Sequence, residues 1–224
     1  MRVLAITYAI AVALTLVSAS PLPVEDDVLV SRGAVQCGEV GSEQYCKGIV
    51  FSDAQYLCGD WRLGPAMLPR MGPITRVVAS WQRFGDLCPA EFIEKWTQPD
   101  GSWKLPYFKG FMVDDKTGLM LAKEVDLKIG TRLDRFGGEE QGRYLADEKT
   151  PYAARSIPPS NLNTYKDAKD HPNNYYLYEV SKEFKALAGP TAPYYGQKGK
   201  GMQYYVPETV AFLLKNGYLR RVRI

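Results

Sequence analysis

Four cysteines constrain the fold of this chain more than any other feature. All of them, Cys37, Cys46, Cys58 and Cys88, lie in the first half of the sequence. An even number of cysteines in an exported chain predicts disulfide bonds. Of the three pairings that are open, we favour Cys37 with Cys46 and Cys58 with Cys88, because these are nearest neighbours along the chain. A zinc site is the alternative, but C-x-x-C spacing is absent and the single histidine is distant.

The N-terminus has the pattern of a secretory signal peptide. Arg2 supplies a positive charge, Val3 to Val17 is almost wholly apolar, and Val17-Ser18-Ala19 places small residues at the cleavage positions. A membrane anchor is the alternative, but this run is shorter than the about 20 residues that span a bilayer. We therefore expect residues 1–19 to be a signal peptide and the protein to be secreted, extracellular or at the cell surface, without a membrane span.

Charge and histidine content exclude several classes of function. The chain has 28 Lys and Arg against 25 Asp and Glu, with no basic run, so neither a nucleic-acid partner nor a membrane patch is indicated. A single histidine, His171, rules out the two-histidine chemistry of many small secreted nucleases. It lies in a polar loop, where we expect a solvated ring. We find no D-x-D-x-D-G loop and expect no calcium or other metal site.

The rest of the chain predicts an α+β fold. After a leader or linker (20–35) we expect a cysteine-tied N-terminal region (36–95) and a catalytic domain (96–224). A hairpin is predicted around the turn at 115–118, strands at 175–180 and 218–224, and a helix at 207–215. The pattern at 75–84 fits a strand or a short helix. Strands without βαβ alternation favour a mainly antiparallel sheet with a few short helices.

Three motifs follow one another in the second half. Residues 130–137 read G-T-x-x-D-R-F-G, residues 151–159 contain A-R-S-x-P-P, and residues 201–204 read G-x-Q-Y. In this order they resemble the tuberculosis necrotizing toxin (TNT) domain, and the whole chain resembles the cysteine-bearing fungal surface NADases that carry it. The resemblance implies a central twisted, mainly antiparallel β-sheet of the TNT or ADP-ribosyltransferase-like type. It also implies an NAD(P) glycohydrolase for which NAD or NADP is the substrate and not a cofactor. Related fungal enzymes are dimers, so a homodimer is open.

The resemblance assigns catalytic roles to Arg135 and Gln203. A guanidinium can hold a phosphate through two parallel hydrogen bonds, although a salt bridge with Asp134 is the structural alternative. Gln203 stands where classical ADP-ribosyl-transferring enzymes have a catalytic glutamate. Its amide can hold a ribose hydroxyl or a water without ionising.

Four further residues are expected to bind the substrate. Phe136 is a candidate to stack on the nicotinamide, with a buried core phenylalanine as the alternative. Arg155 has a substrate-side or supporting role. Tyr144 matches an aromatic position that the family places near NAD, although one residue is inserted before it. Tyr176 stands where the bacterial toxins have a histidine.

Two other functions remain open at this stage. An ADP-ribosyltransferase or cyclase on a related fold is disfavoured because no E-x-E or Q-x-E pair occurs. A non-enzymatic secreted binding protein would be favoured if Arg135, Arg155 and Gln203 were scattered over the surface. For the hydrolase we expect a dissociative mechanism that relies on positioning and electrostatics.

Overall fold

The computed structural model describes residues 37–70, 72–166 and 170–223. These residues belong to one contiguous unit, 34–224. The predicted signal peptide (1–19) and leader (20–35) lie outside the described residues. The predicted boundary between an N-terminal region and a catalytic domain at residue 96 stays a prediction.

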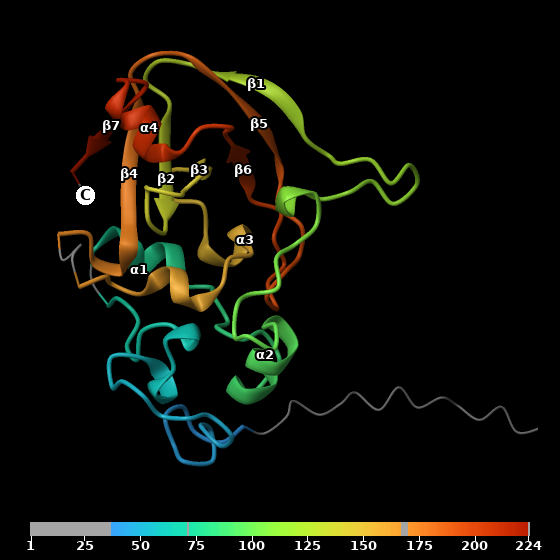
Figure 1. The fold of residues 1–224 in the computed structure, drawn as a ribbon, viewed down its shortest axis with the longest axis vertical. Coiled ribbons are helices and arrows are strands. Elements are labelled where there is room, and N and C mark those ends of the chain that lie inside the picture. Colours follow the sequence, from blue (N-terminus) through green and yellow to red (C-terminus); the bar gives the residue numbers. More distant parts are fainter. Residues whose placement is uncertain (1–36, 71, 167–169, 224) are drawn as a thin grey trace, which may run out of the picture. The chain divides into compact units, whose positions relative to one another are not determined.

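A seven-stranded sheet forms the framework, in the order β1-β5-β6-β3-β2-β4-β7. Every pairing between its strands is antiparallel, which confirms the predicted fold class (Figure 1). The predicted strand at 175–180 is present, and the closing strand is present in shorter form. The strands are β1 (Lys123–Leu127), β2 (Arg132–Phe136), β3 (Tyr144–Asp147), β4 (Tyr175–Val180), β5 (Phe184–Pro190), β6 (Met202–Tyr205) and β7 (Leu219–Val222).

The helices are few and short. They are α1 (Pro73–Val78), α2 (Pro89–Trp96), α3 (Tyr152–Arg155) and α4 (Val210–Lys215), with 3₁₀ turns at Leu57–Gly59, Trp61–Leu63, Phe108–Gly110, Pro159–Leu162 and Pro172–Asn174. The segment 75–84, for which the sequence left two options, begins in helix α1. Helix α4 starts later than predicted because Thr209 caps it, its hydroxyl accepting a hydrogen bond of 3.2 Å from the Phe212 amide.

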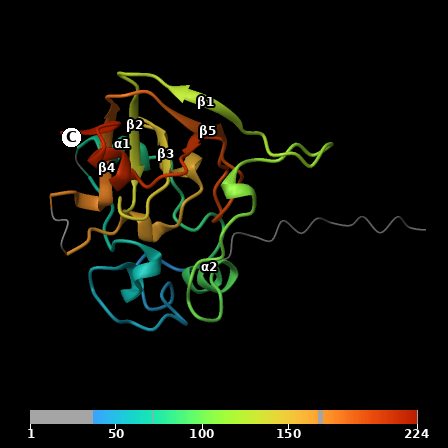
Figure 2. The ribbon, with the colours of Figure 1, turned by 45° about the horizontal axis from the view of Figure 1, so that its top comes forward.

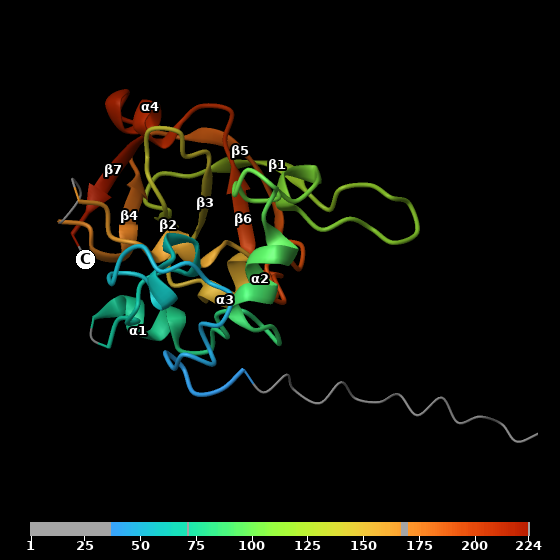
Figure 3. The ribbon, with the colours of Figure 1, turned by 60° about the horizontal axis from the view of Figure 1, so that its bottom comes forward.

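The two faces of the sheet are covered by different helices. Successive strand residues point to opposite faces, so Tyr175 and Tyr176 on β4 belong to different cores. One core contains Tyr176 and Tyr178 together with residues of α4, and the other contains Tyr175 and Phe136 together with residues of α1. Figures 1 and 3 show α4 at one end of β4 and α1 at the other.

The disulfide pairing predicted from the sequence is wrong. Cys37 is bonded to Cys88 and Cys46 to Cys58, so that one bridge is nested inside the other. The cost of closing a loop grows only slowly with its length, and proximity in sequence is therefore a weak guide to pairing. Here the chain between Cys37 and Cys88 folds back on itself, so that Cys88, at the beginning of α2, lies beside Cys37. Leu57 and Leu63 of this segment and Phe92 of α2 form an apolar core together with Tyr195 from the second half of the chain.

The predicted hairpin around residues 115–118 is present. Val113 pairs with Met120, and Phe111 pairs with Thr191 near the end of β5. The hairpin projects away from the sheet in each of the views (Figure 2). Within the part of the chain that the structure describes, no helix has the length and apolar character needed to cross a membrane.

Candidate active site

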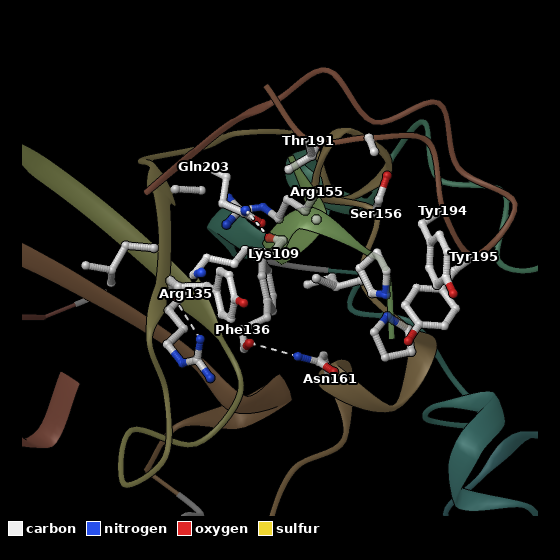
Figure 4. A pocket seen from close by; sticks show the side chains of 18 of the residues that line it. Lys109, Arg135, Phe136, Arg155, Ser156, Asn161, Thr191, Tyr194, Tyr195 and Gln203 are labelled. Carbon is white, nitrogen blue, oxygen red and sulfur yellow. Dashed lines mark hydrogen bonds between the residues drawn. The ribbon is translucent and has the colours of Figure 1, made fainter. Parts of the chain in front are cut away.

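One cavity of about 300 Å³ brings the three motifs together (Figure 4). This volume is at the lower end of the range for small-molecule sites, roughly 300–1,000 Å³. Five of the predicted site residues line it, namely Arg135, Phe136, Tyr144, Arg155 and Gln203. Tyr176 is not among the lining residues.

Gly201 explains how two of the motifs meet. Its amide donates to the carbonyl of Ala154 at 2.9 Å. A Cβ atom at position 201 would lie only 2.6 Å from that carbonyl oxygen, which is closer than real Cβ atoms approach. A glycine, which has no Cβ, allows another chain segment to approach its backbone closely. In the structure it lets β6 approach the A-R-S-x-P-P segment, and this contact sets Gln203 beside Arg155.

A buried ion pair joins Asp134 to Arg155 at the floor of the cavity. Two contacts form it, Nη1 to Oδ1 at 2.6 Å and Nη2 to Oδ2 at 2.9 Å. The carboxylate also accepts hydrogen bonds from the Tyr175 hydroxyl (2.8 Å) and the Lys149 amide (3.0 Å). Burial, and then the charge of Asp134, raise the pKa of Tyr175, so its hydroxyl stays a donor.

The guanidinium of Arg155 is engaged on its other side too. Its Nε and Nη2 donate to the carbonyl of Thr150 at 2.9 and 2.8 Å. The group also lies over the ring of Phe136, 5.1 Å from the ring centroid. These contacts fit the supporting role among the two roles expected for Arg155.

Arg135 is not paired with its neighbour Asp134, because adjacent strand residues point to opposite faces. Its Nε donates to the carbonyls of Gly137 (3.2 Å) and Gly138 (3.1 Å), and Nη1 donates to that of Tyr144 at 2.8 Å. Figure 4 shows the guanidinium turned away from Gln203 and toward the loop between β2 and β3. Burial lowers the pKa of Arg135, and neighbouring tyrosines and Glu139 oppose this shift.

Glu139, a residue of the same loop, holds the loop in place through its carboxylate. Its buried carboxylate accepts a hydrogen bond of 2.6 Å from the Tyr178 hydroxyl and forms an ion pair with Arg221. Burial and this carboxylate together raise the pKa of Tyr178. Arg135 and Glu139 therefore fix the loop that connects two lining residues, Phe136 and Tyr144.

The aromatic residues of the site differ in exposure. Phe136 is buried, with its ring 4.7 Å from that of Tyr175 and 5.1 Å from that of Tyr152, centroid to centroid. This is the packing that the sequence allowed as the alternative to stacking on a ligand. Tyr144 is exposed and packs against Tyr205 at 5.3 Å.

Gln203 presents its amide to the cavity from β6. Its Nε2 donates to the carbonyl of Lys109 at 2.9 Å, an acceptor that fixes which end of the amide is nitrogen. Among the described residues, the amide oxygen Oε1 has no hydrogen-bond donor. It is therefore left to accept a hydrogen bond from a ligand.

Tyr176 and His171 lie on the other side of the sheet. The ring of Tyr176 is buried in the core that contains Tyr178, and His171 stacks on it at 4.3 Å. The predicted solvated ring of His171 is thus incorrect, because the residue is partly buried against β4. A substrate contact of Tyr176 stays a prediction.

Several lining residues were missed by the sequence reasoning. They include Lys109, Asn161, Tyr194 and Tyr195. Asn161 donates to the carbonyl of Phe136 at 3.0 Å and so holds the end of β2. No sequence motif marked the segment that carries Lys109. Strand alternation in β2 would have separated Asp134 from Arg135.

The cavity offers little acid–base chemistry. Asp134, which is ion-paired, is the only carboxylate among its described lining residues, and no histidine is among them. Across residues 37–70, 72–166 and 170–223, no cluster of His, Cys, Asp or Glu could hold a metal ion.

Comparisons with known proteins show what the chain is similar to. The family model described as tuberculosis necrotizing toxin matches residues 126–222. The conidial surface nicotinamide adenine dinucleotide glycohydrolase nadA of Aspergillus fumigatus is 43% identical over 180 residues, covering 79% of this chain and 75% of that protein. The solved structure of tuberculosis necrotizing toxin with its immunity factor IFT is similar at 20% identity and a TM-score of 0.49, over 67% of this chain and 83% of that one. Tse6 in complex with Tsi6 follows at 18% identity and a TM-score of 0.32, over 46% and 72%.

Proposed function

The chain belongs to the tuberculosis necrotizing toxin family, and on that basis we propose that it is an NAD glycohydrolase. It would cleave the bond between nicotinamide and ribose and release nicotinamide and ADP-ribose. A relative that is 43% identical carries this activity in its name. The observation that carries the proposal in this chain is the meeting of Gln203, Phe136 and the Asp134–Arg155 pair in one cavity.

The amide of Gln203 has the position and polarity to hold the ribose. Its nitrogen is fixed on the carbonyl of Lys109, which leaves the oxygen to accept a hydrogen bond from a ribose hydroxyl or from the attacking water. An amide does this without ionising, so it stays effective over a wide pH range. Preorganised polar groups of this kind stabilise charge that develops in a transition state.

The chemistry needs no strong base. As the N-glycosidic bond breaks, its electron pair returns to the nicotinamide nitrogen and the leaving group becomes neutral. Positive charge develops on the ribose, and a water oxygen then bonds to the same carbon and releases its proton to solvent. The single carboxylate of the described cavity lining is engaged by Arg155, which supports a dissociative route without a general base.

We also propose that the protein is secreted and acts outside the cell or at its surface. Two disulfides support this, since such bonds persist in oxidising surroundings. The relative named above is a conidial surface protein. Either NAD or NADP is the substrate, and a homodimer is the proposed assembly.

Product analysis tests the activity directly. The purified chain, without the signal peptide, is incubated with NAD, and nicotinamide, ADP-ribose and cyclic ADP-ribose are separated by chromatography. Equal amounts of nicotinamide and free ADP-ribose are expected. Cyclic product, or ADP-ribose attached to protein, would instead identify a cyclase or transferase. If no NAD is consumed, a non-enzymatic binding protein would be the remaining interpretation.

A further inference from the structure

The cations of the cavity are unequally available to a ligand. The proposed substrate carries a diphosphate, which needs positive charge. Arg155 is already paired with Asp134 and the Thr150 carbonyl. Arg135 is held by two loop carbonyls and by the carbonyl of Tyr144. Lys109 is the remaining cation among the described lining residues.

Lys109 is in a different state from the two arginines. Its side chain is exposed, and its Nζ lies 5.1 Å from the centroid of the Tyr205 ring. Among the described residues it forms no ion pair with a carboxylate. An exposed cation over an aromatic ring is held weakly, whereas a hydrogen bond between an ammonium and a phosphate is charge-assisted on both sides.

The backbone of this segment is fixed although the side chain is not. Phe108, Lys109 and Gly110 all have left-handed φ values, of 52°, 55° and 77°. Such a run is strained for residues other than glycine and persists where the surroundings impose it. The Lys109 carbonyl accepts the hydrogen bond from Gln203, so the backbone of Lys109 is bound to the amide that would face the ribose.

We propose that Lys109 binds the diphosphate of the dinucleotide substrate. This inference rests on the proposed function. When the substrate enters, Nζ leaves the ring of Tyr205 and pairs with a phosphate oxygen. The hydrogen bond from Gln203 to Lys109 then keeps the phosphate contact in register with the ribose contact. Lys109 is a binding residue in this scheme and takes no part in bond cleavage.

The test compares Lys109→Gln with a matched control, Lys182→Gln. Lys182 also lies over a tyrosine, with Nζ 4.5 Å from the Tyr218 ring centroid, but it does not line the cavity. The probes are ADP, whose binding is measured by calorimetry, and NAD, whose turnover is measured. Lys109→Gln is expected to weaken ADP binding and raise KM for NAD by about tenfold each, with kcat within about threefold of wild type. Lys109→Arg restores most of the loss, and Lys182→Gln equals wild type.

Nicotinamide riboside and NADP separate the alternatives. The riboside has no phosphate, so its binding should be the same in Lys109→Gln and in the wild type. Wild-type affinity for ADP in Lys109→Gln would overturn the inference. So would an equal loss for the riboside, or a loss confined to NADP, which would place the lysine at the 2′-phosphate. ADP binding is measured without turnover, so the two claims can fail separately. If the wild type cleaves NAD and Lys109→Gln binds ADP normally, only the inference about Lys109 is refuted. Failure to cleave NAD refutes the proposed function.

Discussion

Asp134 and Arg155, from different motifs, form a buried ion pair that joins β2 to the end of α3. The carboxylate of Asp134 has no exposed surface, and the two contacts of the pair measure 2.6 and 2.9 Å. Hydrogen bonds from Tyr175 and Lys149 complete the environment of the carboxylate. The motif residues are thus connected through a shared charge pair as well as a shared cavity.

Asp134→Asn should destabilise the protein strongly. The substitution keeps the shape but leaves the buried guanidinium of Arg155 without its counter-charge, which typically costs about 3–5 kcal/mol. Urea unfolding followed by circular dichroism measures the change. The control is Glu124→Gln, which removes an exposed ion pair with Lys185 and should leave the midpoint where it is. An unchanged midpoint for Asp134→Asn would mean that the pair contributes nothing to stability.

Gln203→Ala should fold normally and lose most of its activity. Removing one aimed polar contact from a site costs about 10²–10³ in rate. The amide lies at the rim of the cavity, so the unfolding midpoint should stay close to that of the wild type. Initial rates of nicotinamide release from NAD provide the measurement, and Gln98→Ala on a surface turn provides the control. Near wild-type turnover in the folded variant would remove Gln203 from the mechanism.

Arg135→Lys should impair the enzyme by loosening the loop between two cavity-lining residues, Phe136 and Tyr144. Three carbonyls of the β2–β3 loop and the first residue of β3 share this guanidinium, and a lysine cannot reproduce its planar fork. We expect faster hydrogen exchange over residues 137–143 together with weaker binding of ADP-ribose. Weaker binding without any change in exchange would show instead that Arg135 contacts the phosphate directly. Arg143→Lys, in the same stretch but outside the cavity lining, is the control.

The sequence allowed the fold class and five of the lining residues to be predicted, because both follow from local pattern. A run rich in β-forming residues marks β4, and the ordered motifs mark Arg135, Phe136, Arg155 and Gln203. The partner of a charged side chain depends on the tertiary fold. The sequence offered Asp134 as a partner for Arg135, whereas alternation along β2 points Asp134 to the other face, where the end of α3 brings Arg155 to it.

Lys109 and the disulfide pairing depend on contacts that are distant in sequence. Lys109 meets Gln203 only because the segment before the hairpin folds over β6. Cys37 meets Cys88 only because the N-terminal segment returns to its start. Neither contact leaves a periodic pattern that could be recognised in the sequence.

The two disulfides should differ in their contribution to stability. In the chain-entropy model, closing 51 residues between Cys37 and Cys88 stabilises by about 4 kcal/mol, and closing 12 residues between Cys46 and Cys58 by about 3 kcal/mol. We expect all four cysteines to be oxidised in the secreted protein. Intact mass with and without reduction before alkylation checks the oxidation, and peptide mapping checks the pairing. A Cys37–Cys46 peptide would contradict the structure, and four thiols that react without reduction would reopen a metal site.

Turnover should be almost independent of pH around neutrality. The only histidine stacks on Tyr176, on the opposite face of the sheet from the cavity. An enzyme without a histidine base shows no step near the unperturbed histidine pKa of about 6.5. Burial raises the pKa values of Tyr144, Tyr194 and Tyr195, so these lining residues keep their protons up to a higher pH than usual. The rate should therefore stay level from about pH 5.5 to about pH 8.5.

His171→Ala should give the same profile, with a small loss of stability from the missing ring contact. A step near 6.5 that disappears in His171→Ala would show that the histidine acts as a base and would contradict the dissociative mechanism.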